Sequence, residues 1–186
     1  MTDGEDRYRR YLDELHRQHP RLRLIPKPAA LLQRSIGRAL TLLTLGGQRR
    51  YLTDYVTTIG ARVYLPVGWD RRSAEERYVT MRHEAVHLAQ FARFGLLPMA
   101  LAYLLLPLPV GLAWCRYRLE RAAYEETLRA AAELFGPGKL VEPAFRQRIL
   151  GQFTGPAYAW MWPFPGAVAR WYDEAAARLG APTVAS

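Results

Sequence analysis

The chain has 186 residues, of which 50% are hydrophobic, 12% aromatic and 23% charged, and its formal net charge is +9. This is an ordinary globular composition. It excludes a disordered tail and a fibrous repeat, and a chain of this length can bury a core without disulfides. The single cysteine, Cys115, excludes an intramolecular disulfide framework and a cysteine-based structural zinc site. We therefore expect one compact domain over residues 1–186.

The N-terminal third is predicted to combine helices with a short hairpin. An apolar stripe at helical spacing predicts a helix over 5–18, residues 20–28 are expected to be extended, and a second helix is predicted over 28–45. Residues 51–65 are rich in β-branched and apolar side chains around Gly60, which favours two short strands or a hairpin.

The rest of the chain is predicted to be helical. Ser73 and Glu76 form a capping box at the start of a helix that should end at Gly95. Further helices are predicted over 116–135, 143–151 and 167–179. The expected fold class is therefore α+β, mostly helical, with a short strand or hairpin before the helix that starts at Ser73.

The segment His83-Glu84-Ala85-Val86-His87 lies within that helix and carries the chemistry of the chain. Histidines four residues apart stack one turn apart on one helical face, where both imidazoles can reach a single Zn²⁺ ion. Glu84 lies about 100° around the helix from His83, so its carboxylate can hold and deprotonate a zinc-bound water. The alternative is a pair of helix histidines without a metal.

A catalytic zinc site needs a third protein ligand and an open position. Glu120 follows on a separate predicted helix, on one stripe with Tyr124 and Leu128, and is the favoured candidate. Glu125 and Glu126 are alternatives on the same helix that point away from this stripe. Two further histidines, His16 and His19, lie upstream at a polar helix end and are not favoured.

The pattern His83-Glu84-x-x-His87, followed on a later helix by Glu120-x-x-Ala123, resembles the gluzincin branch of the zinc metallopeptidases. The resemblance covers residues 55–130 at most. It implies a zincin-like active-site helix, Zn²⁺ held by His83, His87 and Glu120, and Glu84 as the catalytic base. It also implies hydrolysis of peptide bonds in a peptide or protein substrate.

Two features around this pattern leave alternatives open. Many gluzincins carry Asp four residues after the third ligand, whereas this chain has Tyr124, which could donate a hydrogen bond to a ligand or an oxyanion, or could pack in the core. The segment Val63-Tyr64-Leu65 resembles the edge strand on which zincins bind an extended peptide, and it could equally be part of a core hairpin.

Residues 96–115 contain no charged side chain and have the length of a transmembrane helix. Three prolines interrupt them, and a single span would place the histidine pair and Glu120 on opposite sides of a membrane. We therefore expect a buried or re-entrant apolar hairpin, with peripheral membrane contact through 96–115 as the alternative. The arginines that would suit anionic headgroups are Arg93, Arg116 and Arg118.

Aromatic side chains cluster between Tyr158 and Phe164, where a core-capping loop is expected and a substrate-side pocket or membrane-facing lip is the alternative. Trp114 and Trp171 are expected in the core.

The basic charge alone identifies no partner. The 26 basic residues are arginines except for Lys27 and Lys139, and they are scattered, which favours solvated helix faces over a nucleic-acid site. The charged N-terminal residues lack the apolar region of a secretory signal, so we expect a cytoplasmic protein, with membrane association as the alternative.

These patterns predict a zinc-dependent metallopeptidase. The alternatives are a catalytically silent metal-binding or interaction module, and a protease recruited to a membrane or to DNA by its basic surface.

Overall fold

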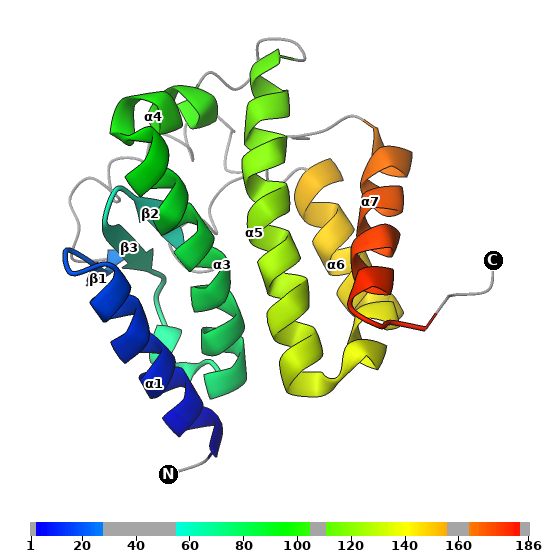
Figure 1. Ribbon diagram of the computed structural model, residues 1–186, viewed down its shortest axis with the longest axis horizontal. Coiled ribbons are helices and arrows are strands. Elements are labelled where there is room, and N and C mark those ends of the chain that lie inside the picture. Colours follow the sequence, from blue (N-terminus) through cyan, green and yellow to red (C-terminus); the bar gives the residue numbers. More distant parts are fainter. Residues whose placement is uncertain (1–2, 28–54, 105–110, 156–163, 183–186) are drawn as a thin grey trace. The chain divides into compact units, whose positions relative to one another are not determined.

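The computed structural model describes residues 3–27, 55–104, 111–155 and 164–182, and its fold is mostly helical α+β, as predicted. Its contacts divide the chain into two compact units, residues 1–96 and 97–186, and a single domain stays a prediction. The elements in chain order are α1 (Asp3–Gln18), β1 (Arg23–Pro26), β2 (Thr57–Ile59), β3 (Arg62–Leu65), the 3₁₀ helix η3 (Trp69–Arg71), α3 (Ala74–Phe94), α4 (Leu96–Leu104), α5 (Gly111–Phe135), the 3₁₀ helix η4 (Pro137–Val141), α6 (Pro143–Thr154) and α7 (Pro165–Arg178) (Figure 1).

The first unit contains a three-stranded mixed sheet in the order β1-β3-β2. Strands β2 and β3 form the predicted antiparallel hairpin, and Gly60 at its turn has φ +60°, a conformation that side chains with a Cβ rarely adopt. Strand β1 pairs in parallel with the other edge of β3, with Leu24 opposite Val63. The segment predicted only to be extended therefore contributes a strand, and β3 becomes the middle strand.

Helix α1 packs on α3 within the same unit. The carboxylate of Glu5 accepts a 2.5 Å hydrogen bond from the guanidinium of Arg77, which is largely shielded from solvent. Between the same two helices, the rings of Tyr11 and Tyr78 meet edge to face with centroids 5.3 Å apart. These contacts hold one side of α3 in place.

Helix α3 has the boundaries that the sequence predicts. The hydroxyl of Ser73 accepts a 3.1 Å hydrogen bond from the backbone N–H of Glu76, and the helix ends at Gly95, whose φ is +83°. Its buried residues are Tyr78, Met81, Glu84, His87 and Leu88. The buried face of α3 therefore mixes apolar side chains with two ionisable ones.

The second unit packs α5, η4, α6 and α7 around one core. Helix α5 begins at Gly111, earlier than the predicted residue 116, and α6 continues to Thr154. The hydroxyl of the buried Tyr172 donates a 2.7 Å hydrogen bond to the carbonyl of Leu140, and burial raises the pKa of this tyrosine to about 12. The buried core residues are Tyr117, Tyr124, Leu128, Ala131, Leu140, Phe145, Ile149, Phe153, Val168, Trp171, Tyr172, Ala175 and Ala176.

The two tryptophans expected in the core have different environments. Trp171 is buried, as predicted, but Trp114 is 48% exposed, so its placement in the core was wrong. Its ring lies under the guanidinium of Arg118 one turn along α5, 5.5 Å from ring centroid to Cζ. The predicted helix over 28–45 and the aromatic cluster up to residue 163 lie outside the described residues.

Candidate metal site

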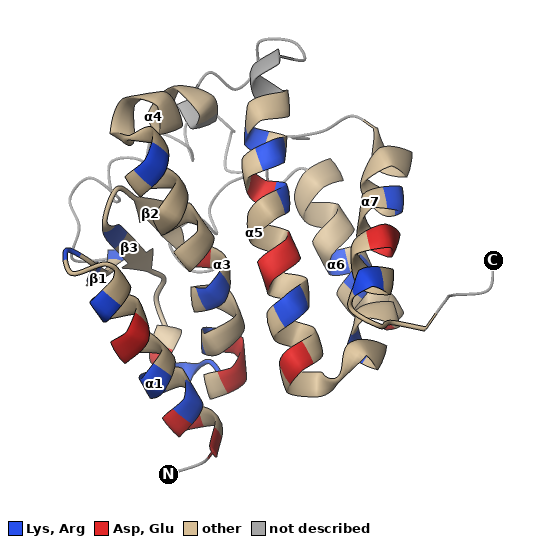
Figure 2. Cartoon of the chain, viewed as in Figure 1, with Lys and Arg blue, Asp and Glu red and all other residues tan. Residues whose placement is uncertain are grey.

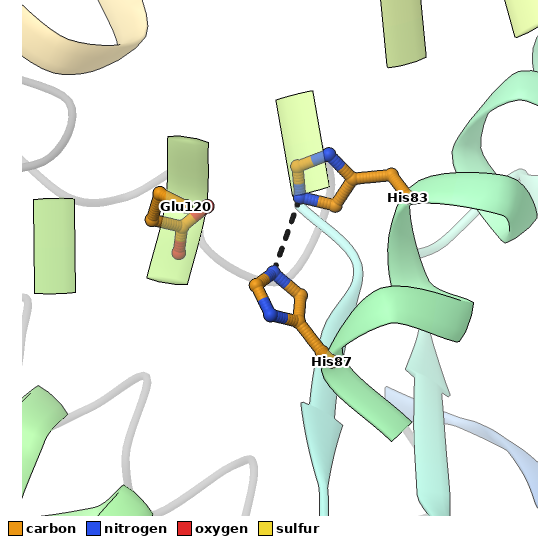
Figure 3. Close-up of side chains that lie close together, drawn as sticks. All are labelled: His83, His87 and Glu120. Carbon is orange, nitrogen blue, oxygen red and sulfur yellow. Dashed lines mark hydrogen bonds between the residues drawn. The ribbon is translucent and has the colours of Figure 1, made fainter. Parts of the chain in front are cut away.

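Helix α3 brings the two predicted histidine ligands together. Their Nε2 atoms lie 3.2 Å apart and their ring centroids 5.0 Å apart (Figure 3). Two nitrogen ligands at 2.0–2.1 Å from a tetrahedral zinc ion lie about 3.3 Å apart. The spacing of the imidazoles of His83 and His87 therefore fits a shared ion without rearrangement of the helix.

A hydrogen bond from the next turn of α3 selects the tautomer of His87. Its Nδ1 lies 2.9 Å from Oε1 of Gln90, and because an amide oxygen only accepts, Nδ1 carries the proton. With Nδ1 as the donor, a neutral imidazole presents the lone pair of Nε2 toward Nε2 of His83, which lies 3.2 Å away. A metal ion would accept that lone pair, and Gln90 would keep the ring of His87 oriented.

Glu84 lies on the buried side of α3, and a strand residue holds its carboxylate. The hydroxyl of Thr58 on β2 donates a hydrogen bond to Oε2 of Glu84 with a donor–acceptor distance of 2.6 Å. This is a short, charge-assisted bond, and it uses one of the two carboxylate oxygens. The β2–β3 hairpin therefore orients the side chain predicted to act as the base.

A second group near Glu84 is Lys27, which directly follows β1 and is fully buried. Burial lowers the pKa of this amine to about 8, and the nearby carboxylate of Glu84 opposes that shift. Buried ionisable side chains are rare unless an opposite charge or hydrogen bonds compensate them. Lys27 and Glu84 place one positive and one negative group in the interior of the first unit.

Sequence reasoning missed both Thr58 and Lys27 as functional candidates. Thr58 looked like one β-branched strand residue among several, and its bond to Glu84 spans 26 positions. A signal for Lys27 was present, because nearly all other basic residues of the chain are arginine. An amine can lose its proton when it is buried, whereas a guanidinium stays charged, so the two lysines were the positions to consider for a buried amine, and Lys27 is the buried one.

The predicted third ligand, Glu120 on α5, is 3% exposed. One ligand atom from each of His83, His87 and Glu120 lies within 4.8 Å of the other two, and these residues form a candidate metal site in the described part of the chain (Figure 3).

The two alternative glutamates on α5 have other partners. Glu125 accepts a 2.8 Å hydrogen bond from the indole of Trp171, and Glu126 pairs with Arg129. Of the three glutamates, Glu120 is the one whose carboxylate groups with the two histidines.

Tyr124 lies one turn after Glu120, as its spacing predicts, and it is buried. Its ring packs against Phe153 of α6 with centroids 5.1 Å apart, inside the core of the second unit. This contact supports the packing alternative, while donation of a hydrogen bond to a ligand or an oxyanion stays a prediction.

Of the two alternatives for Val63, Tyr64 and Leu65, the edge strand is wrong and the core hairpin is confirmed. They belong to β3, which is paired on both sides, with β1 in parallel and β2 antiparallel, and all three side chains are buried. Backbone pairing with a substrate peptide needs an unpaired strand edge, which β3 does not offer. The parallel pairing with β1 depends on residues far away in the sequence and was not predicted.

No family model matches the chain, and searches of curated proteins and of solved structures find no significant similarity. The resemblance to gluzincins therefore rests on the His83/Glu84/His87 pattern and Glu120 alone.

Proposed function

We propose that the chain is a zinc-dependent metallopeptidase in which His83, His87 and Glu120 hold the ion. The observation that supports this most strongly is the grouping of two imidazoles and a buried carboxylate, with Glu84 placed one residue after the first histidine. Two histidines, one carboxylate and an open position are a common ligand set of catalytic zinc.

The donor set fits a divalent ion with a small adjustment. The imidazole nitrogens already have a tetrahedral spacing, while the full group extends up to 4.8 Å, more than the roughly 3.3 Å of a tetrahedral edge. Ion binding would draw the carboxylate of Glu120 toward the imidazoles.

In the proposed mechanism a bound zinc ion supplies Lewis acidity, which polarises the scissile carbonyl and lowers the pKa of water. Glu84 accepts the proton of the attacking water and returns it to the leaving amine. The hydroxyl of Thr58 holds one oxygen of this carboxylate, so the other is presented in a fixed orientation. The buried Lys27 supplies a positive charge that offsets part of the cost of burying the carboxylate.

The proposed peptide-binding strand is β2 in place of β3. Strand β2 lies at one end of the strand order and pairs with β3 along one edge only, in the sheet of the described residues. It also carries Thr58, whose hydroxyl contacts Glu84. A peptide that adds to the outer edge of Thr57–Ile59 would therefore lie beside the residues that carry the chemistry.

Substitution of the proposed base tests this function. Tag-free protein is loaded with zinc and incubated with unfolded casein and with a random peptide library. Glu84→Gln is expected to retain stoichiometric zinc and to hydrolyse peptides about 10²- to 10⁴-fold more slowly. Glu126→Gln is the matched control because it removes a carboxylate of the same chain that pairs with Arg129, and it should cleave at the wild-type rate.

Two results would overturn the proposal. If Glu84→Gln cleaves as fast as the wild type, Glu84 is not the base. If the zinc-loaded wild type cleaves neither casein nor any library peptide, the chain is a metal-binding module without peptidase activity.

A further inference from the structure

Helix α4 departs from the usual pattern of a surface helix. It contains no charged residue, and Figure 2 shows its ribbon without a blue or red segment. Met99 is buried, but Leu97 is 70% and Leu101 46% exposed, and Leu96 is exposed beside them. Leu97 and Leu101 are four residues apart and share one helical face, while Met99 points about 200° away from Leu97. Helix α4 is therefore apolar on its buried side and also on its exposed side.

We call Leu96, Leu97 and Leu101 the α4 face. The exposed side of a helix in a globular protein is normally polar or charged, whereas contiguous exposed apolar side chains indicate a binding surface. Nothing in the proposed hydrolysis uses these three leucines, so their exposure needs a separate explanation.

The charge of the surrounding sequence identifies the kind of partner. No Asp or Glu occurs between Glu84 and Glu120, and the charged residues of this segment are all arginine: Arg93 and Arg118 are exposed, whereas Arg116 is buried. The segment that contains the α4 face is thus cationic, in a chain whose net charge is already +9. Its electrostatic complement is an anionic surface.

Two exposed aromatic residues flank the α4 face in the sequence, and each contacts an arginine. Phe94 is about half exposed, with the guanidinium of Arg93 at 5.3 Å from its ring centroid, and Trp114 has Arg118 at 5.5 Å. Aromatic rings with adjacent arginines are typical of the membrane–water interface. There the ring enters the headgroup layer and the guanidinium reaches phosphate groups.

We propose that the α4 face binds the surface of an anionic lipid bilayer, with its leucines at the boundary between headgroups and acyl chains. Nine residues of helix extend about 14 Å, too short to cross a hydrocarbon core of about 30 Å, so the contact is peripheral. In agreement, no helix among the described residues is long and apolar enough to span a membrane. This proposal does not depend on the metal site.

A second copy of the chain is a weaker candidate for the partner. In a symmetric dimer built on the α4 face, the same acid-free segment would meet itself. Its arginines would face like charges, whereas phosphatidylglycerol headgroups neutralise them.

Vesicle co-sedimentation of the full chain tests the proposal. Wild-type protein is mixed with phosphatidylcholine vesicles that either contain or lack one quarter phosphatidylglycerol. We expect binding to the anionic vesicles only, weakened by salt, and about tenfold or greater loss of affinity in the double variant Leu97→Ser/Leu101→Ser. The matched control Val67→Ser/Phe135→Ser removes two apolar side chains of similar exposure elsewhere and should bind like the wild type.

A second readout uses the unmodified chain, in case the serine variant fails to fold. Brominated lipids should quench tryptophan fluorescence in the wild type, and Trp114→Phe should remove most of this quenching. Three results would overturn the proposal: no preference of the wild type for anionic vesicles, full binding by a folded Leu97→Ser/Leu101→Ser variant, or quenching unchanged by Trp114→Phe. A lipid-free dimer that the leucine substitutions dissociate would instead assign the α4 face to self-association.

Discussion

Helices α3 and α4 follow each other in the chain and deviate from ordinary burial in opposite directions. Helix α3 buries ionisable side chains, Glu84 and His87, on its inner face, whereas α4 exposes leucines to solvent. Burial of ionisable side chains costs folding free energy unless hydrogen bonds or opposite charges compensate it, whereas a patch of exposed leucines leaves folding free energy little changed and indicates a binding surface. On α3 the compensation comes from hydrogen bonds and a nearby cation, while for α4 no partner within the described chain covers the leucines. The two proposals rest on these two departures from ordinary burial.

The largest effect near α3 is expected from Lys27, in the pH dependence of the free energy of unfolding. Because burial lowers its pKa from 10.5 to about 8, the unfolded chain binds more protons than the folded one between these values. The free energy of unfolding should therefore rise with pH across this window, by up to about 3 kcal/mol relative to a variant without the amine.

Urea unfolding of the wild type and Lys27→Met, at about pH 7 and about pH 10, measures this difference. Lys139→Met, which removes the other lysine of the chain, controls for the loss of an amine and should keep the wild-type rise. An identical pH dependence in the wild type and Lys27→Met would contradict a buried charge at this position.

The hydrogen bond from Thr58 to Glu84 gives the next effect. Thr58→Val keeps the shape of the side chain but removes the donor, and we expect hydrolysis to slow about 10- to 100-fold, as for loss of a bond to a charged group. The decrease should lie in kcat with KM little changed, since the bond orients the base.

Thr58→Ser restores the hydroxyl and should recover most of the rate. If Thr58 had only a structural role, Thr58→Ser and Thr58→Val would hydrolyse peptides equally slowly. Steady-state kinetics of the wild type and the two variants distinguishes the two cases.

Substitution of Gln90, which orients His87, is expected to lower zinc affinity by a factor no larger than the loss of rate in Thr58→Val. Gln90→Leu removes the acceptor for Nδ1 while keeping a side chain of comparable size, and zinc affinity should fall about 10-fold. Competition with a chelating dye measures this affinity, with Gln18→Leu on the surface of α1 as the control. Unchanged affinity would show that the ring of His87 is oriented without Gln90.

The smallest effect is expected from the serine substitutions on α4, and it distinguishes α4 from α3 most clearly. Because Leu97 and Leu101 are exposed, Leu97→Ser/Leu101→Ser should change the free energy of unfolding in the absence of lipid by less than about 0.5 kcal/mol. Thermal or urea unfolding checks this value. A loss of several kcal/mol would mean that the leucines pack against the chain, and it would remove the contrast between α3 and α4.

Structural features that depend on residues close together in the sequence were predicted correctly. The capping box at Ser73 and the glycine at position 95 set the limits of α3, and the four-residue spacing placed His83 and His87 on one face. The helical spacing placed Glu120, Tyr124 and Leu128 on one stripe of α5, and all three are buried.

Contacts between distant segments were not predictable in this way. The parallel pairing of β1 with β3 turned the expected edge strand into a central one. The bond between Thr58 and Glu84 joins a hairpin to a helix. Hydrophobicity alone also could not show that Trp114 faces outward, because an apolar stretch does not specify which of its sides is covered.

Zinc affinity of single-residue variants tests the central claim most directly. Equilibrium competition is measured for the wild type, His83→Ala, His87→Ala and Glu120→Gln, with Glu125→Gln and Glu126→Gln as controls for the alternative ligands. We predict one zinc ion per chain, a loss of at least about 100-fold in affinity for each of the first three variants, and wild-type affinity for the two controls. Wild-type affinity in Glu120→Gln, or a loss confined to Glu125→Gln or Glu126→Gln, would contradict the account.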